Sequence, residues 1–131
     1  MDLQAALLCE AAVAHDTLLS LVDAGRTQVV GVDFPLPLRM TLALMVNCEE
    51  SDLDSSHEMR IEVVAAASGA AVGTASRPFS VLPMEIPSAV NVPLVADLSP
   101  IGLPDVGDYE VRVFIDDKWL AVLPIQALRG G

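Results

Sequence analysis

Nine prolines divide this chain of 131 residues into pieces of about the length of a β-strand. Proline has no backbone N–H, so it ends helices and interrupts the hydrogen bonding of sheets. The prolines are spread through the chain, at positions 35, 37, 78, 83, 87, 93, 100, 104 and 124. This distribution favours a fold of short segments joined by turns.

The clearest strand pattern lies near the C-terminus. In residues 109–115 apolar side chains alternate with Glu110 and Arg112, which is the two-residue period of a half-buried strand. Asp116-Asp117 then predicts a tight turn into a second apolar run over residues 119–125. We therefore expect a β-hairpin here.

Similar apolar segments recur along the rest of the chain, at 38–46, 59–64, 72–82 and 89–98. Leucine and alanine in residues 3–22 also fit a short helix, but every later segment is strand-like, so we expect two or three strands there. The pattern predicts an all-β fold, an antiparallel β-sandwich of seven to nine strands, immunoglobulin-like or C2-like. Residues 1–127 are expected to form this single domain, and residues 128–131 an exposed C-terminal tail.

Acidic residues outnumber basic ones by 18 to 7, which gives a formal net charge of −11. Nucleic acids and anionic membranes bind clustered lysine and arginine, so we expect neither as a partner. The start of the chain lacks the basic residues of a secretory signal, and a cytoplasmic protein is expected. Cys9 and Cys48 are then two small buried thiols, with a disulfide between them as the alternative.

Several stretches of the chain carry a family resemblance. They are 7–12, 18–32, 35–42 and the ending Gly107-Asp108-Tyr109-Glu110…Arg112…Ile115-Asp116. They resemble a family of small, uncharacterised bacterial proteins, a domain of unknown function, whose ending reads P-G-x-Y-x-x-R-x-x-x-D-G. Here Val106 replaces the proline and Asp117 the turn glycine. The resemblance implies a β-sandwich with a buried tyrosine corner, and it implies no activity or catalytic residue.

The residues of catalysis do not assemble into a set. His15 and His57 are the only histidines, and no serine lies in a Gly-x-Ser-x-Gly sequence. Cys48 is followed by Glu49 and Glu50, whose charges disfavour its thiolate. We expect His15 in a turn, His57 in a solvated loop, and a protein that is not an enzyme and holds no cofactor.

Acidic residues gather between positions 49 and 58, and carboxylate oxygens are the ligands that calcium prefers. An EF-hand starting at Asp52 fails, because His57 stands where glycine is needed and Val63 where the last glutamate is needed. A solvated acidic loop is the expectation, and a calcium-dependent C2-like module is the alternative. Such a module would draw on Glu49, Glu50, Asp52, Asp54 and Glu58, or on Asp105, Asp108, Asp116 and Asp117.

The chain ends in Leu128-Arg129-Gly130-Gly131, the four residues that also end mature ubiquitin. An unbranched Gly-Gly carboxylate fits the narrow channel of an activating or conjugating enzyme. Gly130 and Gly131 are therefore candidate conjugation residues. The alternative is a terminus where glycine is tolerated because nothing packs there.

The leading hypothesis is a non-enzymatic module that binds another protein or assembles with itself. Aromatic residues make up only 4% of the chain, whereas deep ligand pockets usually have an aromatic lining. Unpaired sheet edges offer a simple route to a homodimer. Trp119 is the candidate interface anchor, because tryptophan is enriched at interface hot spots, and its alternative role is to cap the core.

Overall fold

The computed structural model describes residues 1–53, 55–81 and 90–130, which form twelve β-strands and one 3-10 turn, η1 (Glu50–Asp52). The strands are β1 (Asp2–Cys9), β2 (Ala11–His15), β3 (Leu18–Val22), β4 (Gln28–Gly31), β5 (Leu36–Pro37), β6 (Thr41–Cys48), β7 (Ser56–Ala65), β8 (Ala71–Ser80), β9 (Val90–Asp97), β10 (Gly102–Leu103), β11 (Gly107–Ile115) and β12 (Lys118–Arg129). The all-β prediction is confirmed, and three strands occupy the first 22 residues. The number exceeds seven to nine partly because β5 and β10, two residues each, are too short to show any alternation. No helix among the described residues is long and apolar enough to cross a membrane.

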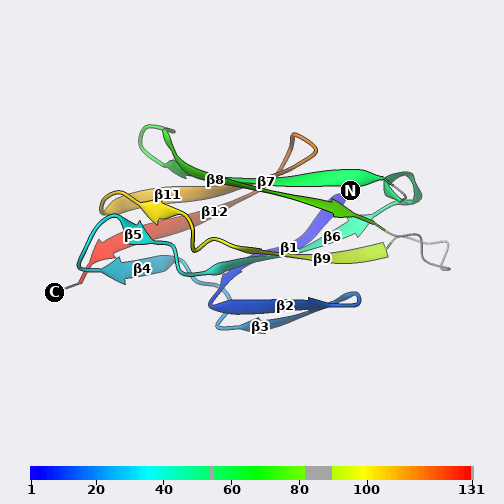
Figure 1. Ribbon diagram of the computed structural model, residues 1–131, viewed down its shortest axis with the longest axis horizontal. Coiled ribbons are helices and arrows are strands. Elements are labelled where there is room, and N and C mark those ends of the chain that lie inside the picture. The colour runs from blue at the N-terminus through cyan, green and yellow to red at the C-terminus, as the bar shows by residue number, and fades with distance from the viewer. Residues whose placement is uncertain (54, 82–89, 131) are drawn as a thin grey trace.

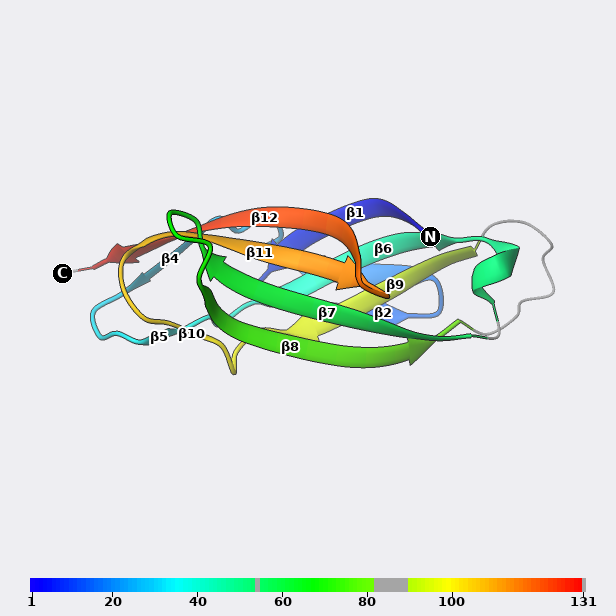
Figure 2. The same ribbon diagram turned by 90° about the horizontal axis from the view of Figure 1, so that it is seen from above.

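The strands are stacked in three layers (Figure 1). A five-stranded sheet in the order β4-β12-β11-β7-β8 packs on a three-stranded sheet in the order β1-β6-β9, which makes the predicted sandwich. Figure 2 shows β12, β11, β7 and β8 of the larger sheet side by side. The β2–β3 hairpin lies against the other face of the three-stranded sheet and forms the third layer (Figure 1). Neighbouring strands are antiparallel except β4 and β12, which are parallel.

The core lies between the two larger sheets, because their strands alternate. In β6 the side chains of Leu42, Leu44, Val46 and Cys48 are fully buried on the inner face. β7 and β11 oppose them with a second set of buried side chains, Met59, Ile61, Val63, Tyr109, Val111, Val113 and Ile115. On the outer face of β6, Ala43 is also buried, since the β2–β3 hairpin covers it. Apolar burial on both faces is therefore specific to the middle layer.

The predicted hairpin of β11 and β12 is confirmed. Ile115 pairs with Lys118, and the two residues between them, Asp116 and Asp117, have φ of 50° and 65°. A two-residue turn with positive φ at both positions matches the right-handed twist of the strands.

The tyrosine corner that the resemblance implies is also present. The Tyr109 hydroxyl donates to the main-chain oxygen of Asp105 at 2.7 Å and accepts from the N–H of the same residue at 3.2 Å. These bonds fix the chain where it enters β11.

Cys9 and Cys48 are free and buried. Strands β1 and β6 are neighbours, but Cys9 lies opposite Thr41 at one end of β6 and Cys48 is at the other end. The register therefore keeps the two thiols apart.

Candidate functional site

The β2–β3 hairpin presents an apolar outer face to solvent. The register pairs Ala11 with Val22, Val13 with Ser20 and His15 with Leu18, so one face of the hairpin carries all six side chains. Val13, Leu18 and Val22 are 60%, 58% and 53% exposed. We call these six residues the hairpin face. Single exposed apolar residues are common, whereas three on one small face make the hairpin face a candidate site.

The local sequence explains how one hairpin has two apolar faces. Asp16 adopts a positive φ of 54° and makes the tight turn between the strands. In β3, Leu19 points toward the three-stranded sheet and is half-buried, whereas its neighbours Leu18 and Ser20 point outward. The two-residue period therefore places apolar side chains on both sides. The expected strands are therefore present, and the missing information was which of their two apolar faces is covered and which is exposed.

The charged residues of the hairpin segment itself are all acidic. Residues 10–23 include Glu10, Asp16 and Asp23, all exposed, and contain no lysine or arginine. Glu10 and Asp23 lie at the base of the hairpin and Asp16 at its turn. The apolar face thus has a carboxylate at each end.

Trp119, the interface residue predicted from the sequence, lies on the five-stranded sheet. Its side chain is 55% exposed, so the alternative of a core cap is wrong. The ring meets Phe114 edge to face, with centroids 5.5 Å apart, and the Arg112 guanidinium lies 5.6 Å from its centre. Arg112 in turn pairs with Glu110 at 3.1 Å. Trp119 therefore already has aromatic and cationic neighbours within the chain.

The C-terminal residues are part of the sheet. Leu128 and Arg129 belong to β12 and pair with Val30 and Gly31, beyond the expected domain boundary at residue 127. The N–H of Gly130 donates to the main-chain oxygen of Gly31 at 3.0 Å. Conjugation through this end would require these residues to detach from β4. Gly131 lies outside the described residues.

His57 is buried, and the prediction that it lies solvated in a loop is wrong. β7 begins at Ser56, and its alternation turns His57 inward together with Met59, leaving the ring 8% exposed. Nδ1 lies 2.6 Å from Oδ2 of Asp116, and Nε2 lies 2.8 Å from the main-chain oxygen of Asp52. The ring also stacks on Phe79, with centroids 5.4 Å apart.

Both polar partners of His57 can only accept hydrogen bonds. The ring must therefore donate from both nitrogens, which requires the protonated imidazolium. The hydrogen bond to Asp116 raises the pKa of His57, and burial opposes this effect without reversing it. Burial likewise raises the pKa of Asp116, but the hydrogen bonds from His57 and from the N–H of Glu58 outweigh it and leave that pKa below its ordinary value. With both nitrogens engaged, His57 has no free nitrogen with which to act as a general base.

The two thiols are unreactive by environment. Burial raises the pKa of Cys9. Burial, with a smaller contribution from the charge of Asp52, raises the pKa of Cys48 to about 11. Because the thiolate is the nucleophile, both thiols are weak nucleophiles at neutral pH.

The acidic residues between 49 and 58 are partly ordered by local contacts. The N–H of Glu49 donates to Oδ2 of Asp52 at 2.8 Å and lowers the pKa of that carboxyl group. The amino group of Met1 lies 3.4 Å from the same carboxylate. The second predicted set does not gather at one end: Asp105 and Asp108 lie at the start of β11, whereas Asp116 and Asp117 follow its end. Asp116 is held by His57 and Asp117 by Arg60. Within residues 1–53, 55–81 and 90–130, no group of three or more His, Cys, Asp or Glu side chains is placed to hold a metal ion, and Asp54 lies outside those ranges.

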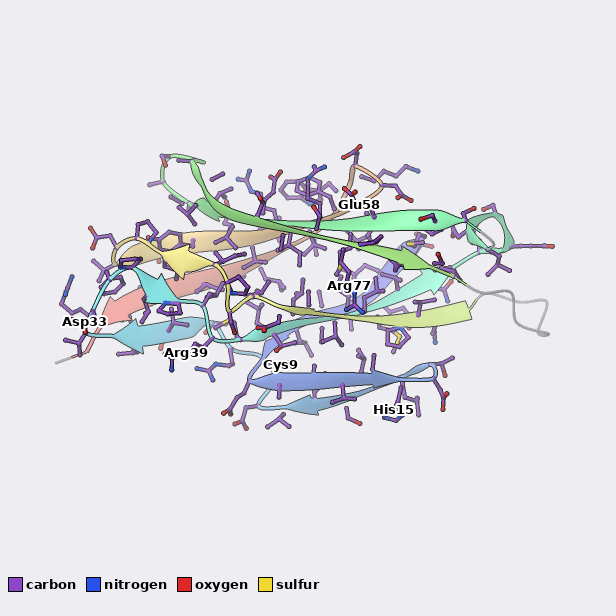
Figure 3. All side chains as sticks on the ribbon, viewed as in Figure 1. Cys9, His15, Asp33, Arg39, Glu58 and Arg77 are labelled. Carbon is purple, nitrogen blue, oxygen red and sulfur yellow. The ribbon has the colours of Figure 1, made fainter. Side chains whose placement is uncertain are left out.

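His15 lies at the end of β2 beside the Asp16 turn, as predicted. Its Nε2 is 3.0 Å from the hydroxyl of Ser20, across the hairpin face. Figure 3 shows His15 at the turn end of the hairpin, far from Arg39.

A protein-family profile described as a family of unknown function (DUF6941) covers residues 4–128, which includes the whole β2–β3 hairpin and strands β2 to β11. No curated protein matches the chain. The predicted resemblance to a family of unknown function is confirmed. The bacterial origin of the family stays a prediction. Since the match spans nearly all 131 residues, the chain belongs to this family of unknown function.

Proposed function

We propose that this protein is a non-enzymatic module that binds another protein through the hairpin face. The observation that carries the proposal is the exposure of Val13, Leu18 and Val22 side by side on one rigid two-stranded layer. A partner that covers these side chains removes apolar surface from water, at about 25 cal/mol for each Å². The engaged nitrogens of His57 and the protonated thiols support a role without catalysis.

The acidic residues beside the hairpin face favour a different protein, rather than a second copy of this chain, as the partner. A two-fold dimer through the hairpin face would bring Glu10, Asp16 and Asp23 close to the same carboxylates of its partner, and like charges in apposition are unfavourable. The protein also carries a net charge of −11. We therefore commit to a partner with an apolar patch bordered by lysine or arginine. A reducing, cytoplasmic compartment is part of the proposal, and two free buried cysteines support it.

The test uses a photo-cross-linking phenylalanine analogue in place of Ser20, at the centre of the hairpin face. The matched control carries the analogue in place of Ser76, which is also an exposed strand serine but lies on β8. Each protein is expressed in its native host, irradiated and recovered under denaturing conditions, and the cross-linked species are identified by mass spectrometry.

We expect one protein to cross-link at position 20 and not at position 76. The cross-link should disappear when Leu18→Gln and Val22→Thr are added, and should weaken as salt rises. Trp119→Gln should leave it unchanged. Cross-linking only to a second copy would overturn the choice of partner and assign self-assembly, and loss only in Trp119→Gln would assign the site to Trp119.

A further inference from the structure

The free edge of β4, a strand of four residues, carries no charge, proline or bulge. β4 is the outermost strand of the five-stranded sheet and pairs only with β12 within the described residues. Its sequence and the next residue read Gln-Val-Val-Gly-Val, with neither charge nor proline. Val30 and Val32 are 61% and 64% exposed. Sheet edges are commonly protected by lysine, proline or a bulge, because an open edge can pair with another strand.

The hydrogen bonds of β4 show which groups face the open edge. Gln126 donates to the main-chain oxygen of Thr27, and Gly130 donates to that of Gly31. Alternate residues of a strand direct their main-chain groups to opposite edges. The N–H and C=O of Gln28 and Val30 therefore point away from β12.

A groove runs beside this edge. It has a volume of about 590 Å³ and is lined by Val29, Val30 and Val32 on one side and by residues 35–37 and Arg39 on the other, but by no residue of β12. Leu36 packs closely on Gly31, where an added Cβ would lie 2.3 Å from its Cδ1. The groove is thus open along the free edge of β4, and the Leu36 side chain fills the space beside Gly31.

Two guanidinium groups line the groove, those of Arg26 and Arg39. Within the described residues neither pairs with a carboxylate, whereas Arg60 and Arg112 do. Glu10 and Asp33 line the groove as well. Figure 3 shows Asp33 nearer the C-terminal end of the molecule than Arg39. Glu10 and Arg39 line a neighbouring hollow together, so the Arg39 end of the groove carries both charges.

Arg77 and Arg129 also lack a carboxylate partner among the described residues, but their guanidinium groups donate to main-chain oxygens. Guanidinium groups form strong charge-assisted hydrogen bonds with carboxylates, so Arg26 and Arg39 favour a ligand carboxylate.

We infer that β4 and this groove bind an extended peptide that adds a strand to the sheet and places a carboxylate beside Arg26 and Arg39. The open main-chain groups of Gln28 and Val30 supply the pairing that an extended peptide needs. Val30 and Val32 favour β-branched side chains in that peptide, and the arginines favour Asp or Glu at one end. This surface is separate from the hairpin face, so the two proposals stand or fall independently.

The test starts from a library of random eight-residue peptides displayed on phage and selected on the immobilised protein. Val30→Pro removes the N–H that faces the open edge and leaves the bonds to β12 in place. Proline is tolerated at such edge positions, and circular dichroism checks that the variant folds. The matched control is Val30→Thr, which keeps the N–H and the branched side chain.

We expect selected peptides to combine β-branched residues with Asp or Glu at one end, and to bind the native protein and Val30→Thr equally but Val30→Pro poorly. Fluorescence polarisation with the most enriched peptide should show about tenfold weaker binding for each of Arg26→Gln and Arg39→Gln. That difference should vanish for a peptide whose acidic residues are changed to amides. Hydrogen exchange of the Val30 amide should slow when the peptide binds.

No enrichment on the native protein would overturn the inference, as would peptides that bind Val30→Pro as well as Val30→Thr. Equal binding of acidic and amide peptides would overturn the assignment of the arginines. Leu18→Gln tests independence, because it should abolish the cross-link at the hairpin face and leave peptide binding unchanged. Loss of peptide binding in Leu18→Gln would show that the groove is not a separate site.

Discussion

His57→Leu removes the buried ring that links the main chain at Asp52 to the Asp116 turn. The native ring donates at 2.6 Å to a carboxylate and at 2.8 Å to a carbonyl. A hydrogen bond involving a charged group contributes about 1.5–3 kcal/mol to stability. The Asp116 carboxylate is 45% exposed, so water can hydrogen-bond to it when the ring is lost. The hydrogen bond between His57 and Asp116 therefore contributes near the lower end of this range. With the carbonyl bond added, we expect His57→Leu to lower the free energy of unfolding by about 2–3 kcal/mol at pH 6.

The loss should shrink as pH rises. The pKa of His57 is raised in the folded protein, so its contribution is complete below the unfolded value of about 6.5 and is lost as pH rises through the folded pKa. Above that point the neutral ring can donate from one nitrogen only. The difference between native protein and variant should therefore fall to about 1 kcal/mol by pH 9.

Urea unfolding followed by circular dichroism at pH 6 and pH 9 measures this difference. Asp116→Asn is the control, since asparagine also tolerates the positive φ of the turn but carries no charge. In this control the pH dependence of stability between 6 and 9 should flatten. An equal loss for His57→Leu at both pH values would refute the argument that the ring is charged.

Three further predictions concern the core and the turns. Tyr109→Phe removes the hydroxyl that bonds Asp105 and should lower stability by about 1–2 kcal/mol in the same urea assay; an unchanged midpoint would show that the corner adds nothing. Gly73→Ala places a Cβ 2.7 Å from Cγ2 of Ile101 and should lower stability by about 1–3 kcal/mol, but by less in an Ile101→Ala background, which lacks that atom. Cys48, with a pKa of about 11, should react with a thiol reagent only when the protein unfolds, and rapid labelling under native conditions would contradict its burial.

The strands could be predicted where local pattern decides the structure. Residues 109–115 alternate, and Asp116-Asp117 supplies a turn whose positive φ values suit aspartate, so the β11–β12 hairpin follows from adjacent residues alone. The parallel pairing of β4 with β12 could not be predicted. It joins residues about 100 positions apart, and nothing in either segment specifies the other.

In the candidate sites too, features set by neighbouring residues could be predicted, whereas contacts between distant residues could not. Trp119 could be identified as an exposed aromatic candidate, but its contacts with Phe114 and Arg112 come from neighbouring strands. His57 was misjudged because acidic residues surround it in sequence, whereas its partner Asp116 is 59 positions away. Strands were expected in residues 3–22, but the hairpin face was missed because apolar residues on both sides of a strand do not show which side another layer covers.

The position of β12 in its sheet sets an order for folding during synthesis. β12 is the last strand to be made, yet it lies between β4 and β11 in the interior of the five-stranded sheet. The three-stranded sheet, β1-β6-β9, is fully synthesised once Asp97 has been added. The five-stranded sheet is complete only later, when β12 has been made. The residues of β12 that pair with β4 are made 98 residues after it. At a synthesis rate of about 5–20 residues per second, the delay between the two strands is about 5–20 s. During that interval both edges of β4 are unpaired, and residues 126–129 close one of them once they have been made.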